Sequence, residues 1–118
     1  MCDGARYRAF QYDTETYDGV SHRTNVLWLQ EPDNTVSWQG RWSTPTQWHG
    51  SFVQEGDLLI IMFDCQGRTD RLKSVSLLPT EPGQWRGVDY AGRRITLTLL
   101  ITFDNPGRAS HWQWAGPA

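Results

Sequence analysis

Apolar and polar residues alternate along most of this chain with a period of two. The clearest case runs from Arg94 to Phe103, where the apolar side chains would share one face and three threonines the other. Those apolar residues are Ile95, Leu97, Leu99, Ile101 and Phe103. No long stretch shows the three-to-four-residue spacing of an amphipathic helix. The pattern therefore predicts an all-β protein.

Short turns rich in proline, glycine, asparagine and aspartate divide the chain into eight predicted strands. They cover residues 26–30, 35–42, 47–54, 58–64, 71–78, 84–90, 94–103 and 111–115. Links this short join antiparallel neighbours, because parallel pairs need crossovers of about a dozen residues or more. We therefore expect an antiparallel up-and-down meander forming a single domain over residues 26–118.

Residues 1–25 precede this meander and are rich in aromatic side chains. They include Tyr7, Phe10, Tyr12 and Tyr17. The predicted strand at residues 58–64 is apolar on both faces, which indicates that something covers its outer side. We expect the N-terminal segment to cover that strand, to add an edge strand, or to plug one end of the sheet.

Three short elements place a glycine two residues after a tryptophan, at Gly40, Gly50 and Gly87. Glycine lets a strand bend sharply and leaves room for neighbouring aromatic rings. In the third element the next aromatic falls one residue later, and a bulge at Gly87 would restore its face. Sheets with such bends can close, so we expect a small β-barrel, with a two-layer β-sandwich as the alternative.

The triplet Gly40-Arg41-Trp42 resembles the Gly-x-Trp of lipocalins, which are small up-and-down barrels. The resemblance covers three residues and falls on the second predicted strand, whereas lipocalins carry theirs near the N-terminus. It is consistent with a lipocalin-like barrel and does not assign the chain to that family.

Composition and charge exclude several classes of function. The 118 residues include 11 basic and 13 acidic ones, so no overall field attracts nucleic acid or an anionic membrane. The two cysteines and three histidines show no metal-binding spacing. No apolar run is long enough to span a bilayer, and the first residues lack the features of a secretion signal. We expect a soluble cytoplasmic protein with no cofactor or metal and no nucleic-acid or membrane partner.

In a meander, successive turns alternate between the two ends of the sheet, and here the two ends differ in charge. The acidic end collects Glu31, Asp33, Glu55, Asp57, Glu81 and Asp104. The other end is mixed but basic, and its arginines are Arg41, Arg68, Arg71, Arg93 and Arg94. Such ends could bind a ligand, associate head to tail in a homo-oligomer, or simply be solvated loops.

The tryptophan-rich interior and the basic end together favour a barrel that binds an amphipathic, anionic small molecule. The anionic head would contact Arg71, Arg93 and Arg94. The cavity would be lined by Trp38, Trp42, Trp48 and Phe52.

The alternative is a non-catalytic interaction protein. It would present surface aromatics such as Trp112 and Trp114, or its charged ends, to a protein or a glycan. No set of residues nominates a reaction. Asp89 and Tyr90 could form an acid–base pair. Cys65 is a poor nucleophile candidate, because the negative charge of the neighbouring Asp64 would oppose thiolate formation.

Overall fold

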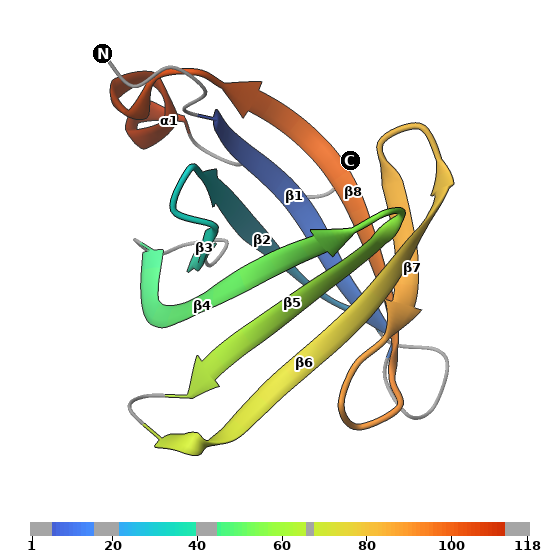
Figure 1. The fold of residues 1–118 in the computed structure, drawn as a ribbon. Coiled ribbons are helices and arrows are strands. Elements are labelled where there is room, and N and C mark those ends of the chain that lie inside the picture. Colours follow the sequence, from blue (N-terminus) through green and yellow to red (C-terminus); the bar gives the residue numbers. More distant parts are fainter. Residues whose placement is uncertain (1–5, 16–21, 40–44, 66–67, 113–118) are drawn as a thin grey trace.

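The computed structural model is a closed barrel of eight antiparallel strands followed by a short helix (Figure 1). It describes residues 6–15, 22–39, 45–65 and 68–112. The elements are β1 (Arg6–Glu15), β2 (His22–Glu31), β3 (Thr35–Gln39), β4 (Pro45–Glu55), β5 (Leu58–Cys65), β6 (Arg68–Glu81), β7 (Gln84–Val88), β8 (Arg94–Phe103) and α1 (Pro106–His111). Each strand pairs with the next, and β8 pairs with β1. The predicted all-β meander is confirmed, and it closes into a barrel.

The eight strands of the barrel differ from the eight predicted ones at both ends of the chain. Residues 6–15, within the segment expected to cover, edge or plug the sheet, form β1, which pairs with both β2 and β8. In addition, β2 begins at His22, before the predicted boundary at residue 26. The N-terminal segment therefore supplies the strand that closes the barrel.

The predicted strand at residues 111–115 is corrected to a helix end. His111 is the last residue of α1, and residues 113–115 lie outside the described part of the chain. The helix starts here because the Asn105 side chain accepts hydrogen bonds from the backbone N–H groups of Gly107 (2.7 Å) and Arg108 (3.4 Å). Pro106, which lacks an N–H group, suits the first helical turn.

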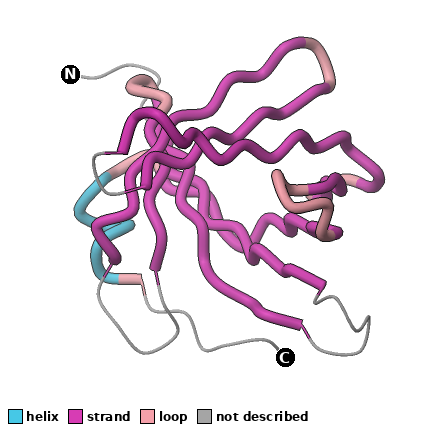
Figure 2. The backbone as a smooth tube through the Cα atoms, turned by 90° about the horizontal axis from the view of Figure 1, so that it is seen from below, coloured by secondary structure: helices cyan, strands magenta, loops and turns pink. Residues whose placement is uncertain are grey.

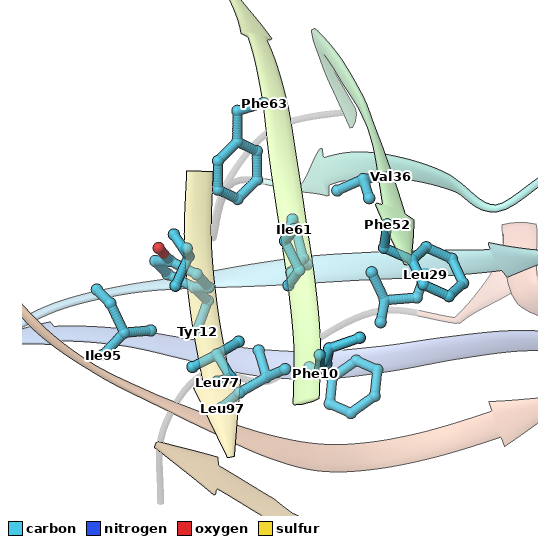
Figure 3. Packing of buried hydrophobic residues seen from close by; sticks show 13 residues of the cluster. Phe10, Tyr12, Leu29, Val36, Phe52, Ile61, Phe63, Leu77, Ile95 and Leu97 are labelled. Atoms are coloured by element: carbon cyan, nitrogen blue, oxygen red, sulfur yellow. The ribbon is translucent and has the colours of Figure 1, made fainter. Parts of the chain in front are cut away.

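The barrel interior holds one apolar core to which every strand except β7 contributes buried side chains (Figure 3). Its buried members are Phe10, Tyr12, Leu27, Leu29, Val36, Phe52, Leu59, Ile61, Phe63, Val75, Leu77, Ile95 and Leu97. Trp85 of β7 packs against them, and its ring meets the Phe10 ring edge-on with 5.5 Å between centroids. Burial of these side chains is the main force that holds the barrel together.

A second apolar cluster lies outside the barrel and includes Ala109 of α1 and Trp112, which follows the helix. Ala9, Val26 and Trp28 are buried in it. The partly buried residues packed against them are Tyr7, Ile101, Phe103, Ala109 and Trp112. The Trp28 ring stacks on Phe103 at 6.3 Å and meets Trp112 edge-on at 5.5 Å. Figure 2 shows the helix on the outer side of the strands.

A register shift in β8 explains how one strand serves both clusters. Ala9 of β1 pairs with Ile101, whereas the next residue, Phe10, pairs with Leu99. Leu100 is therefore the extra residue of a β-bulge. A bulge changes the face to which the following side chains point, because side chains alternate with a period of two.

The bulge corrects the expectation that the apolar residues of Arg94–Phe103 share one face. Ile95 and Leu97, before the bulge, face the barrel core. Ile101 and Phe103, after it, belong to the outer cluster. A strict alternation places all of them on one side, because the sequence does not show that Leu100 is an extra residue in the strand.

Gly50 and Gly87 stand where two strands approach too closely for any side chain. A Cβ on Gly50 would lie 2.2 Å from the backbone oxygen of Met62, and one on Gly87 would lie 1.8 Å from that of Ser76. Close backbone approach is one reason for glycine within a strand. The bulge predicted at Gly87 is wrong, because the pairing of β7 with β6 and with β8 continues through it without a register shift.

Candidate functional site

An arginine side chain projects from β1 toward the barrel core. Arg8 precedes the buried Phe10 by two residues on the same face of the strand, and it lies opposite Leu29 of β2. Its guanidinium carbon is 5.6 Å from the centroid of the Phe10 ring and 5.9 Å from that of Phe52. The charge is therefore held against two aromatic rings, an arrangement that favours a cation.

Two nitrogen atoms of Arg8 are shielded from solvent without a hydrogen-bond partner. Among the described residues, no group accepts from Nε or Nη2. These two nitrogens form one edge of the planar guanidinium, and their N–H bonds can hold the two oxygens of a carboxylate. A buried donor without a partner costs about 1–3 kcal/mol, and more when it is charged. The fold gains nothing from this edge, which makes it the leading candidate for a ligand contact.

An ion pair lies one layer beyond Arg8 toward the same end of the barrel. Arg6 precedes Arg8 by two residues on β1, and Glu31 lies opposite Arg6 on β2. The Nε atom of Arg6 is 2.5 Å from a carboxylate oxygen of Glu31, and the two side chains are 48% and 25% exposed. Burial lowers the pKa of Arg8, the charge of Arg6 lowers it further, and Glu31 raises it.

The end of the barrel that holds Arg8 is the end predicted to be acidic. The turns at residues 32–34, 56–57 and 82–83 lie there together with the start of β1. The sequence analysis assigns Arg6 and Arg8 to neither end of the barrel, because it places residues 1–25 outside the meander. With β1 in the barrel, Arg6 pairs with Glu31 and Arg8 adds a positive charge below the rim.

At the opposite end, the predicted anion contacts Arg93 and Arg94 lie close to carboxylates of the protein. Asp89 is buried, and it accepts hydrogen bonds from the backbone N–H groups of Ala91 (2.9 Å) and Arg93 (2.8 Å) and from Nε of Arg93 (2.8 Å). Arg94 is 81% exposed, with its Nη1 3.9 Å from Glu15. Arg93 thus stabilises the β7–β8 turn, and Arg94 points to solvent.

Of the aromatic residues predicted to line a cavity, Phe52 lies in the core and contacts Arg8. The structure describes the backbone but not the side chains of Trp38, Trp48 and Arg71, and Trp42 lies outside the described residues. The structure therefore brings Phe52 together with an arginine that the sequence analysis does not select. A charged residue at position 8, in register with Phe10 and Tyr12, is the sequence signal that could have identified it.

Burial in the barrel interior strongly affects the titratable hydroxyl group of Tyr12. Its ring is buried and meets the Phe63 ring edge-on at 6.1 Å. Burial raises the pKa of the Tyr12 hydroxyl, the charge of Asp89 raises it further, and Arg93 opposes this effect. The folded protein therefore resists ionisation of Tyr12 more strongly than the unfolded chain does.

We expect the free energy of unfolding to fall above about pH 10, where an unfolded tyrosine begins to ionise. Below that pH the neutral hydroxyl is present in both states and the stability is intact, whereas above it only the unfolded chain releases the proton. Urea unfolding between pH 8 and 11 should show this loss, with a slope of at most about 1.4 kcal/mol per pH unit from this group. The loss should be smaller in Tyr12→Phe, and an identical loss in both proteins would contradict the assignment.

The described residues offer little for other chemistry. Among them, no group of three or more histidine, cysteine, aspartate or glutamate side chains could hold a metal ion. Within the same residues, no helix has the length and apolar character needed to cross a membrane. Asp89, the predicted partner of Tyr90 in acid–base chemistry, is occupied by the hydrogen bonds of its own turn.

Comparison with known proteins does not assign a role to the Arg8 site. No model of a protein family and no curated protein sequence matches this chain.

Proposed function

We propose that the barrel binds an amphipathic small molecule whose carboxylate lies on the Nε–Nη2 edge of Arg8. The observation that carries the proposal is that this edge is shielded from solvent and has no acceptor among the described residues. Arg8 thereby takes the role that the sequence analysis gave to Arg71, Arg93 and Arg94. A barrel that holds a ligand at one end would be lipocalin-like in use.

The surroundings of Arg8 suit an apolar group attached to the carboxylate. Phe10, Phe52 and Leu29 are buried within the core on this side of the barrel (Figure 3). The position of Phe52 is fixed by its backbone N–H, which donates to the carbonyl oxygen of Asn34 in the β2–β3 turn (3.0 Å). Because these side chains are buried, the core on this side must open for the apolar body of a ligand to contact them while its carboxylate meets Arg8.

A carboxylate fits this edge better than a phosphate monoester does. Two parallel donors match the two oxygens of a planar carboxylate, and one guanidinium balances its single charge. A phosphate would bring up to two charges and a third oxygen beside Glu31, to which Arg6 is already bound. We therefore expect monocarboxylates with a hydrocarbon or aromatic tail to be preferred.

The Arg6–Glu31 pair stands at the rim through which such a ligand would enter. Both side chains are partly exposed, and an ion pair of this kind contributes about 1 kcal/mol or less. Opening it to admit a ligand is therefore inexpensive. The pair would close again over the bound carboxylate.

The proposal is tested by titrating the protein with octanoate and 4-phenylbutyrate, and with the corresponding alcohols. Tryptophan fluorescence is a suitable signal, because Trp85 packs against Phe10, and calorimetry gives the affinity. We expect the acids to bind at least about tenfold more tightly than the alcohols, the difference that a charged hydrogen-bonded pair supplies.

Two arginine variants show where the carboxylate binds. Arg8→Met should abolish the preference for the acids, whereas Arg94→Met, which changes an arginine at the other end of the barrel, should retain it. Equal binding of acids and alcohols, or unchanged acid binding by Arg8→Met, would overturn the proposal.

A further inference from the structure

The outer surface of β4–β7 carries apolar side chains that no described element covers. The exposed ones are Val53 (39%), Leu78 (55%) and Val88 (53%), and the partly exposed ones are Leu58, Ile60 and Met62 of β5. In Figure 1, β4, β5 and β6 form a layer in front of β1 and β2, whereas the outer cluster under α1 belongs to β1, β2 and β8. We call this uncovered surface the β4–β7 face.

The strand register arranges the β4–β7 face in three rows that run across the strands. The central row is Val53, Ile60, Ser76 and Val88, one from each strand in order. The row nearer the Arg8 end contains the pairs Glu55–Leu58 and Leu78–Arg86, which the pairing of Leu59 with Leu77 brings next to each other. The row on the other side is Ser51, Met62 and Ser74.

We propose that the β4–β7 face binds a second copy of this chain across a two-fold axis parallel to the strands, between β5 and β6. A two-fold contact uses the same patch on both subunits. With the axis in this direction, each row meets the same row of the partner in reverse order. Thus β5 of one copy faces β6 of the other, and β4 faces β7.

With the rows in reverse order, large side chains of the β4–β7 face meet small side chains of the same face on the partner subunit. Ile60 and Met62 of β5 are large, and they meet the small side chains of Ser76 and Ser74 on β6 of the partner subunit. Large side chains of one sheet thereby enter the spaces of the other, as in the packed layers of a β-sandwich. A second copy of the chain thus provides a surface of the required shape.

The reversal is also complementary in charge. Glu55 and Arg86 stand at opposite ends of the same row, where the barrel wall curves away from the contact, and each lies on the side of the oppositely charged residue of the partner subunit. Both are exposed, and among the described residues neither has an ion-pair partner. Leu58 and Leu78 lie between them and meet in the same way. Two symmetric sets of opposite charges would thus flank an apolar centre, as is typical of a protein interface.

Charge reversal tests the dimer and its geometry. In sedimentation equilibrium up to about 500 µM, we expect the protein to self-associate, and Glu55→Arg or Arg86→Glu to weaken the dimer about tenfold or more. The double variant Glu55→Arg/Arg86→Glu restores both pairs with opposite polarity, so its association should return toward that of the unchanged protein.

Two further variants separate this face from the rest of the surface. Ile60→Asp places charges at the centre of the interface and should give a monomer, whereas Asp33→Arg in the β2–β3 turn should leave association unchanged. Circular dichroism checks that each variant is folded. A protein that is monomeric at every concentration, or a double variant no better than the single ones, would overturn the proposal. Loss of carboxylate binding would not overturn the proposed dimer, because the Arg8 site lies inside the barrel.

Discussion

Replacement of Arg8 by methionine is expected to raise the free energy of unfolding by about 1–3 kcal/mol. The guanidinium is held against Phe10 and Phe52 with two donors unpaired, so the folded state bears a desolvation cost that the unfolded chain avoids. Methionine keeps an unbranched, adaptable apolar side chain and removes the charge. Urea unfolding of both proteins at neutral pH, without added ligand, measures the difference.

The matched control is Arg94→Met, which makes the same chemical change at a site that is 81% exposed. That variant should differ from the unchanged protein by no more than about 0.5 kcal/mol. If Arg8→Met loses stability instead, the arginine serves the fold and the case for a ligand contact is lost. A gain in stability combined with loss of carboxylate binding is the pattern expected where a side chain is kept for function at the expense of stability.

Octanoate should stabilise the unchanged protein more than Arg8→Met and so narrow this difference in stability. A ligand that binds only the folded state adds about 2.7 kcal/mol at a concentration one hundred times its dissociation constant. The unchanged protein gains this amount, whereas Arg8→Met, which should bind octanoate about tenfold more weakly or worse, gains about 1.4 kcal/mol or less. Unfolding curves with and without octanoate therefore connect the stability measurement to the proposed site.

The architecture could be predicted from the sequence because it depends on local signals. Turn residues and alternation between them define β3–β8 and the antiparallel meander, and these are features of short segments. The first strand, β1, could not be predicted in this way, because both of its faces pack against apolar clusters. Phe10 and Tyr12 point into the barrel while Ala9 is buried under the outer cluster, so β1 shows no clear polar face.

The helix α1 was missed for a different reason, because a local signal for it is present in the sequence. The dipeptide Asn105-Pro106 is a helix start signal, because asparagine caps a helix and proline fits its first turn. The predicted strand at residues 111–115 rests on the alternation of Trp112 and Trp114, which spans too few residues to define a strand. A capping side chain of this kind is a stronger local constraint than two tryptophans at a spacing of two.

The candidate site could not be predicted, because it depends on how β1 closes the barrel. Charged residues in turns can be assigned to an end of the sheet, but whether they are already paired is decided by contacts in space. Arg93 is bound to Asp89 of its own turn, and Arg6 pairs with Glu31 across the β1–β2 ladder. The buried donor edge of Arg8 is found only after β1 has been placed between β2 and β8.

Substitution of Gly87 by alanine is expected to cost about 3 kcal/mol or more of unfolding free energy. The added Cβ would lie 1.8 Å from the backbone oxygen of Ser76, whereas such contacts essentially never fall below 3.0 Å. The obstacle is main chain of the paired strand β6, so no side-chain rotation relieves it. Either β6 and β7 separate and lose ladder hydrogen bonds, or the wall of the barrel shifts against the core. Urea unfolding of the variant measures the loss.

Gly56→Ala is the control that separates lack of space from backbone conformation. Gly56 has a φ of +61° in the β4–β5 turn, and a Cβ there would meet nothing within 4 Å. Its replacement should cost only the strain of alanine in the left-handed region, about 1–2 kcal/mol. If Gly87→Ala costs no more than this, the strands do not approach each other as closely as the structure shows. A clearly larger loss would establish that the barrel wall depends on contact between the β6 and β7 backbones at this glycine.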